Sequence, residues 1–100
     1  MPNNYQLGDL VRCHATFSYV AEPIDPDEVR FRFFTPSGLV ATYTFGTHAE
    51  LVRESTGEYV CYVSANEVGS WFYRFESRGN AQSASEKFFV VANSKFDTWV

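Results

Sequence analysis

Hydrophobic and polar residues alternate along most of this chain, and a period of two is the pattern of half-buried β-strands. In the segment 9–19, one parity is apolar or small and the other is mostly polar. The apolar parity carries Val11, Cys13, Ala15, Phe17 and Tyr19. The periodicity of an α-helix is not sustained anywhere in the sequence. The pattern therefore predicts an all-β protein.

Seven short segments show this alternation, and turn or loop signals separate them. The predicted strands are 9–19, 29–35, 39–45, 51–53, 58–64, 70–77 and 84–91. The segment 22–28 is a predicted loop, because its two prolines cannot donate hydrogen bonds to a strand ladder. Pro36 and Gly38 mark a tight turn, in which glycine accepts a positive φ. Short strands at this near-regular spacing predict a β-sandwich or a small barrel.

Parity also separates candidate core residues from candidate surface residues. The predicted core residues of the later strands are Val29, Phe31, Phe33, Tyr59, Cys61, Trp71, Tyr73 and Phe75. Four large apolar residues have the opposite parity and are predicted to share one outer face: Phe34, Val60, Tyr62 and Phe72. An exposed apolar patch of this kind marks an interaction surface. The alternative is that these side chains pair across strands or are covered by the C-terminal segment.

The size and charge of the chain limit the number of domains and the kinds of partner it can have. One hundred residues fit a single domain, which we place at 1–91, followed by a tail at 92–100. The net charge is -4 and the eight basic residues are scattered, which disfavours nucleic-acid binding. No apolar run is long enough to span a membrane. Because the first residues lack the features of a signal peptide, we expect synthesis in the cytosol.

The two cysteines, Cys13 and Cys61, both have core parity, on strands that could lie in opposite sheets. One alternative is a disulfide, which would contribute roughly 2–4 kcal/mol to stability. The other is a pair of buried thiols that pack as small hydrophobic groups. The lack of a signal peptide favours the thiols, because cytosolic proteins are kept reduced.

The sequence offers no recognisable catalytic or metal site. His14 and His48 lack further ligands at metal-binding spacing. Asp25, Asp27 and Glu28 lie in the proline-containing loop, and we interpret them as a solvated turn rather than a calcium site. The sequence contains no nucleophile elbow or phosphate-binding loop. We therefore expect a protein without enzymatic activity, cofactor or metal.

The end of the chain is a second candidate contact region. Its apolar side chains are Phe96, Trp99 and Val100. Aromatic residues at a chain end are costly to leave in water and are typical anchors to a neighbouring protein. Folding back onto the sheet of the same domain is the equal alternative.

Several short motifs resemble those of immunoglobulin-type domains. The Gly-x-Tyr-x-Cys run at 57–61 resembles a corner in which a tyrosine stands two residues before a buried cysteine. Further motifs resemble macroglobulin-like immunoglobulin domains and short immunoglobulin-like proteins among the structural genes of tailed bacteriophages. These motifs are at 8–12, 36–38, 56–59 and 69–74, and the resemblance spans about residues 5–91. One departure is that Trp71 follows Cys61, whereas the core tryptophan of antibody domains lies between the two cysteines.

The resemblance implies an immunoglobulin-like antiparallel β-sandwich of about seven strands. It also implies a virion structural protein, made in the host cytoplasm, that decorates or cements the capsid or belongs to the head–tail neck. Its partners would be the major capsid protein or neck and tail proteins, and the particle would set its copy number. The alternative is a host-surface or carbohydrate-binding module on the virion, with Tyr62 and Phe72 stacking on sugar rings. A module of a bacterial envelope protein is a third possibility, which the lack of a signal peptide disfavours.

Overall fold

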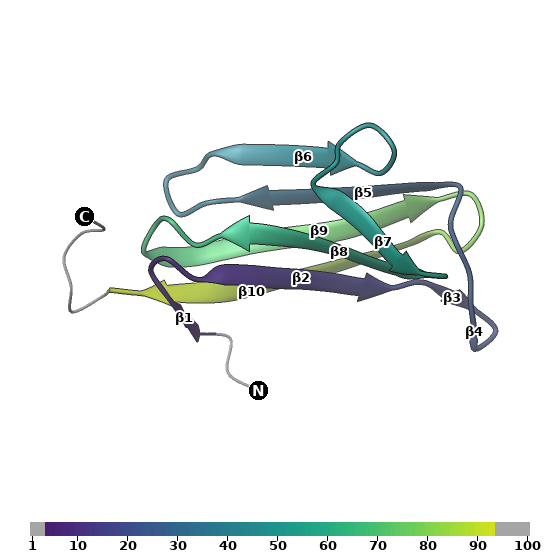
Figure 1. The fold of residues 1–100 in the computed structure, drawn as a ribbon, viewed down its shortest axis with the longest axis horizontal. Helices are drawn as coiled ribbons and strands as arrows, with labels where there is room; N and C mark the ends of the chain where they lie inside the picture. The colour runs from purple at the N-terminus through teal and green to yellow at the C-terminus, as the bar shows by residue number, and fades with distance from the viewer. Residues whose placement is uncertain (1–3, 94–100) are drawn as a thin grey trace.

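The computed structural model describes residues 4–93, and every regular element in that range is a β-strand (Figure 1). The strands are β1 (Asn4–Gln6), β2 (Leu10–Thr16), β3 (Ser18–Tyr19), β4 (Glu22–Pro23), β5 (Glu28–Phe34), β6 (Val40–Thr44), β7 (Leu51–Ser55), β8 (Glu58–Ser64), β9 (Gly69–Arg78) and β10 (Ser83–Ala92). No helix that is long and apolar enough to cross a membrane occurs in this range.

Eight of the strands form two sheets that pack face to face. The larger sheet has the order β1-β10-β9-β5-β6, and the smaller one has the order β2-β8-β7 (Figure 1). The short strands β3 and β4 pair only with each other. A cluster of buried apolar residues from both sheets lies between them and forms the core. The chain is therefore a β-sandwich, as the alternation predicts.

The strand order is that of an immunoglobulin-type sandwich. In that fold, the first sheet contains strands B, E and D, and the second contains C, F and G, which a C′ strand can extend. The order β2-β8-β7 matches the first sheet, and β6-β5-β9-β10 matches the second. One pairing departs from the antiparallel prediction, because β1 runs parallel to β10. The fold prediction is thus confirmed, with one strand more than the sequence pattern indicated at the N-terminal end.

Several predicted boundaries were wrong, and β4 (Glu22–Pro23) lies within the predicted loop 22–28. The first predicted strand continues to position 19, but β2 ends at Thr16 and β3 begins a separate hairpin at Ser18. The backbone turns away because Val20 and Ala21 both adopt positive φ at the tip of this hairpin. At the other end of the chain, β10 extends through Ala92, one residue into the predicted tail.

The core confirms the parity predictions for the central strands. Trp71 is 1% exposed and stacks on Phe89 of β10, with 5.5 Å between the ring centroids. Phe31 and Phe75 are buried beside each other at 4.7 Å on the paired strands β5 and β9. The indole nitrogen of Trp71 donates a hydrogen bond to the carbonyl oxygen of Glu67 at 3.0 Å, so its burial leaves no polar atom unpaired.

The cysteines are neighbours within one sheet, and the expectation of opposite sheets was wrong. Cys13 of β2 and Cys61 of β8 are directly opposite each other in the smaller sheet, and both are buried as free thiols. Burial raises the pKa of Cys13 to about 12 and that of Cys61 to about 11. The B–F disulfide of antibody domains joins the two sheets instead, and here the F position belongs to β9.

The acidic loop is fastened to the turn between β7 and β8. The carboxylate of Asp25 accepts hydrogen bonds from the Nε of Arg53 at 3.0 Å, the backbone N–H of Gly57 at 2.8 Å and the hydroxyl of Tyr59 at 3.3 Å. Position 57 requires glycine, because its φ is 76° and a Cβ there would lie 2.4 Å from the carbonyl oxygen of Phe17. The hydrogen bond from Arg53 is the main reason that the pKa of Asp25 is lowered. Asp25 therefore acts as a structural tie.

Candidate interaction surface

The larger sheet carries a line of apolar side chains across its outer face. Strand register places Phe34 of β5 opposite Phe72 of β9, and Phe72 opposite Phe88 of β10. Val40 of β6 lies opposite Phe34 and extends the line to a fourth strand. We call these four residues the aromatic row. Their residues are 43–70% exposed, so the row is a surface feature and no part of the core.

The rings of the aromatic row are in contact with one another. Phe34 and Phe72 stack with 5.1 Å between centroids and 24° between planes. Phe72 and Phe88 are 6.0 Å apart and tilted by 34°. Cross-strand aromatic pairs of this kind stabilise a sheet, which accounts for part of the row. Yet each ring still presents a large apolar area to solvent, and such area is available for a second molecule.

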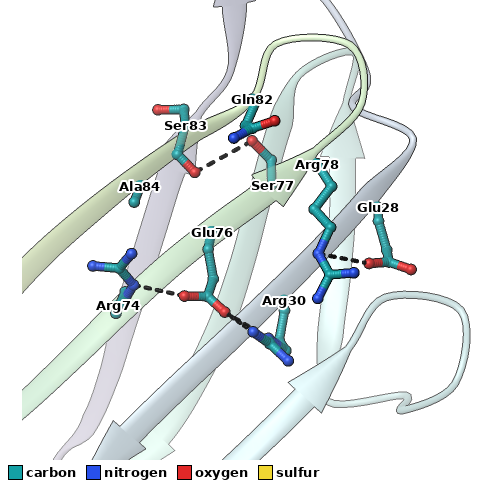
Figure 2. Close-up of a pocket in the computed structure, with 9 residues that line it drawn as sticks. All are labelled: Glu28, Arg30, Arg74, Glu76, Ser77, Arg78, Gln82, Ser83 and Ala84. Carbon is teal, nitrogen blue, oxygen red and sulfur yellow. Dashed lines mark hydrogen bonds and ion pairs between the residues drawn. The ribbon is translucent and has the colours of Figure 1, made fainter.

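A group of arginines lies next to the row along the same strands. Arg32 is two residues from Phe34 on β5, and Arg74 is two residues from Phe72 on β9. With Arg30 they form what we call the arginine cluster, because all three contact the carboxylate of Glu76. The distances to Glu76 are 3.2 Å from Arg32 and 2.6 Å from Arg74. In Figure 2, Glu76 lies between Arg74 and Arg30 and contacts both.

The shared carboxylate of Glu76 stays ionised. Its side chain is only 15% exposed, and this burial by itself raises the pKa. The hydrogen bonds from Arg74 and Arg30 outweigh the burial, so the net pKa lies below the usual value for glutamate. The single negative charge of Glu76 therefore pairs with three guanidinium groups, and the arginine cluster keeps an excess of positive charge.

The aromatic row and the arginine cluster border a shallow groove of about 520 Å³. Its lining includes Phe34, Val40, Phe72, Phe88, Arg32 and Arg74. A second hollow of about 410 Å³ continues past Glu76 toward the turn between β9 and β10. This second hollow is polar, and it holds the ion pair between Arg78 and Glu28 at 3.5 Å (Figure 2). The groove itself offers apolar contact area and cationic hydrogen-bond donors.

The structure brings together only two of the four predicted outer-face residues. Phe34 and Phe72 stack on the larger sheet, whereas Val60 and Tyr62 belong to β8 of the smaller sheet. The prediction of one shared face was therefore wrong. Alternation along a strand determines which face a side chain occupies, but it does not determine the sheet to which the strand belongs. The two candidates for stacking on sugar rings, Tyr62 and Phe72, therefore lie on different sheets.

Val60 was predicted to be exposed, and this was also wrong, because it is 1% exposed. It lies on the outer side of β8, between β2 and β7. Arg12 of β2 and Glu54 of β7 form an ion pair at 2.5 Å, which bridges the strands on either side of β8. The residues directly opposite Val60 are His14 of β2 and Val52 of β7. The predicted contacts Phe96, Trp99 and Val100 lie outside the described residues.

Sequence reasoning missed half of the aromatic row and all of the arginine cluster. Phe88 and Phe89 are adjacent in β10, so one of them had to face outward, and this signal was present in the pattern. Val40 gave no such signal, and alternation placed Arg30 and Arg32 outward without joining them to Arg74 or Glu76. Their significance depends on the register that aligns β6, β5, β9 and β10, and register is a long-range property of the fold.

The residues that line the groove are mainly aromatic and charged. Its lining residues supply phenylalanine rings, guanidinium and ammonium groups and one carboxylate, with no cysteine, serine or histidine among them. Elsewhere in residues 4–93, no three His, Cys, Asp or Glu side chains gather closely enough to hold a metal ion. Comparisons of the chain with protein-family models and with curated proteins gave no match.

Proposed function

We propose that this protein is a non-enzymatic virion structural protein that docks on other phage proteins through the aromatic row. In this proposal, it is an immunoglobulin-like capsid decoration or cement subunit, or a subunit of the head–tail neck. The observation that carries the docking role is the row itself, four apolar side chains aligned over four strands and largely exposed. The resemblance of the sequence to phage proteins supports the virion as its setting.

The aromatic row is suited to docking for two reasons. Its two central residues, Phe34 and Phe72, lie on β5 and β9, whose backbones are paired with a strand on both sides, so the centre of the contact area is ordered before binding. A surface that is already ordered pays less conformational entropy on association. A stable contact of standard size buries about 800 Å² on each partner, so the row would form the centre of a larger footprint. A central aromatic anchor contributes roughly 2–4 kcal/mol when truncated.

The decisive experiment compares two exposed aromatic residues on opposite sheets. Phe72→Ala should weaken binding to phage particles that lack this protein by about 30-fold or more, since 1.4 kcal/mol corresponds to a factor of ten. Tyr62→Ala is the matched control, because Tyr62 is 49% exposed and Phe72 is 43% exposed. Binding is measured by co-sedimentation with the particles over a range of protein concentrations. Equal binding of Phe72→Ala and wild type would contradict the proposal.

The C-terminal residues supply the competing anchor. The double variant Phe96→Ser/Trp99→Ser of the full chain should bind particles within about threefold of wild type if the aromatic row is the anchor. Loss of binding in this variant, with Phe72→Ala unaffected, would transfer the docking role to the tail. A glycan array separates the carbohydrate alternative, because sugar binding that depends on Phe72 without particle binding would favour a recognition module.

A further inference from the structure

We propose that the groove recognises an extended segment of a partner protein in which an apolar side chain, best an aromatic one, and a carboxylate stand two residues apart. The apolar side chain lies on Phe72, and the carboxylate pairs with Arg32 and Arg74. This inference rests on the proposed docking function and adds the chemistry of the partner to it.

The spacing of the groove gives the spacing of the ligand. The aromatic row and the arginines are two residues apart on both central strands, as Phe34 and Arg32 on β5 and as Phe72 and Arg74 on β9. Two residues of a strand span about 6.6 Å. In an extended peptide, side chains two residues apart point to the same side at this same distance. A segment that lies along the strand direction therefore places one side chain on the row and the next on the arginines.

The charges of the groove select a carboxylate. Arg32 contacts Glu76 through one terminal nitrogen at 3.2 Å, and its side chain is 45% exposed. A guanidinium has five N–H donors, so Arg32 has donors left for a ligand. The outer sides of β5, β9 and β10 carry four arginines but three glutamates, although the chain as a whole has a net charge of -4. Arginine binds carboxylates with two parallel hydrogen bonds, which gives both affinity and orientation.

Glu86, the carboxylate among the residues that line the groove, competes only weakly with a ligand for Arg74. Glu86 of β10 lies 3.7 Å from Arg74, and its side chain is 69% exposed. A solvent-exposed ion pair at this distance contributes little to stability. A ligand carboxylate brought in beside the aromatic row is partly shielded from water by its own apolar neighbour, so it displaces Glu86 from Arg74. Glu76 holds Arg74 in place from the other side at 2.6 Å during this exchange.

The test is a selection from a library of short random peptides by mRNA display, with the full chain as bait. Recovered sequences should contain an aromatic and an acidic residue two positions apart. The consensus peptide is then synthesised with its acid and with the corresponding amide, and both are titrated by fluorescence anisotropy. The acid should bind at least about tenfold more tightly than the amide, because a charge-assisted hydrogen bond is lost in the amide.

Variants of the full chain identify the residues that read the ligand. The double variant Arg32→Gln/Arg74→Gln should bind the acid and the amide equally, which makes the comparison a double-mutant cycle. Arg78→Gln is the control, because Arg78 projects from the same face of β9 but pairs with Glu28 away from the row. Phe72→Ala should lose both peptides.

Each outcome of the selection decides a different point. Peptides that need Phe72 but bind as acid and amide alike overturn this inference and leave the docking function standing. A selection in which no peptide depends on Phe72 overturns both. Peptides that bind only when Phe96 and Trp99 are replaced by serine identify the chain's own C-terminal segment as the occupant of the groove, and they overturn the assignment to a partner.

Discussion

The outer faces of the two sheets contain similar residue types in different arrangements. On the larger sheet, apolar residues are opposite apolar residues, so that Phe34, Phe72 and Phe88 touch and form one strip. On the smaller sheet, Tyr62 is opposite Arg12 and Leu10 is opposite Ser64, while the exposed Val52 is opposite the buried Val60. The register of the strands therefore gathers exposed apolar side chains into one strip on the larger sheet and separates them on the smaller sheet.

The charged residues of the two faces differ in the same way. On the smaller sheet, Arg12 and Glu54 form a simple pair at 2.5 Å, and charge is balanced within the pair. On the larger sheet, one glutamate, Glu76, serves three arginines. The first arrangement leaves no charge in excess, and the second leaves N–H donors for a ligand. We infer that a binding surface is better identified by unequal pairing than by the number of charges.

The largest effect on stability is expected at the covered valine of the smaller sheet. Val60→Ala removes two buried methyl groups and should lower the free energy of unfolding by about 2 kcal/mol. Val52→Ala is the control, because Val52 is opposite Val60 on β7 but is 44% exposed. Val52→Ala should lower the free energy of unfolding by less than about 1 kcal/mol. Urea denaturation measures both, and equal losses would contradict the view that Val60 is buried while Val52 is half-exposed.

The next effect tests the shared carboxylate. Glu76→Gln leaves three guanidinium groups without their common partner and should lower the free energy of unfolding by about 1–2 kcal/mol. Glu54→Gln breaks one exposed pair and should cost about 0.5 kcal/mol or less. The same urea titrations give both values. A loss at Glu54 as large as that at Glu76 would remove the distinction between the two charge arrangements.

The pH dependence of stability gives a smaller and independent signal from Glu76. Because its pKa in the folded protein lies below the usual value of 4.5, its stabilisation is fully present above that pH. The stabilisation is lost as the pH falls through the folded-state pKa. The curves of wild type and Glu76→Gln should therefore converge in acid. Val60→Ala is the control, since an uncharged substitution shifts stability equally at every pH, and a Glu76→Gln curve that stays parallel to wild type would contradict the prediction.

Local patterns in the sequence predicted seven of the eight strands in the two sheets, together with the inner and outer sides of those strands, but not the β3–β4 hairpin. The core positions of Phe31, Trp71 and Phe75 follow from alternation alone, because the period of a strand is two. Glycine and proline at the turns divided the chain into segments that contain the main strands, although the ends of several strands differ. The sandwich then follows from the number and spacing of the segments, since many short strands must close into two layers to bury their apolar sides.

The arrangement of the strands could not be obtained in this way. The Gly-x-Tyr-x-Cys motif indicated the correct fold, but it was compared with a corner on the F strand, and Tyr59 lies on β8, which occupies the E position. The same uncertainty placed Tyr62 beside Phe72 and Cys61 in the sheet opposite Cys13. Each error concerns which strands are neighbours, and neighbours are fixed by contacts between residues that are distant in sequence.

A modest effect on stability is expected at the aromatic row, and it compares the outer faces of the two sheets directly. Phe72→Ala should lower the free energy of unfolding by about 1 kcal/mol, because it removes the contacts with Phe34 and Phe88. Tyr62→Ala should cost about half as much, since its directly opposite partner is Arg12 rather than an aromatic ring.

A double-mutant cycle between Phe34 and Phe72 isolates the contact between the two rings. We expect a coupling of about 0.5–1 kcal/mol, because the centroids are 5.1 Å apart and the planes nearly parallel. The matching cycle between Phe34 and Tyr62 should show none, as the two residues lie on different sheets. A coupling of zero within the row would mean that the rings move independently in solution. In that case a partner would have to order them on binding, and the row would lose the preorganisation that favours it over any other exposed aromatic residue.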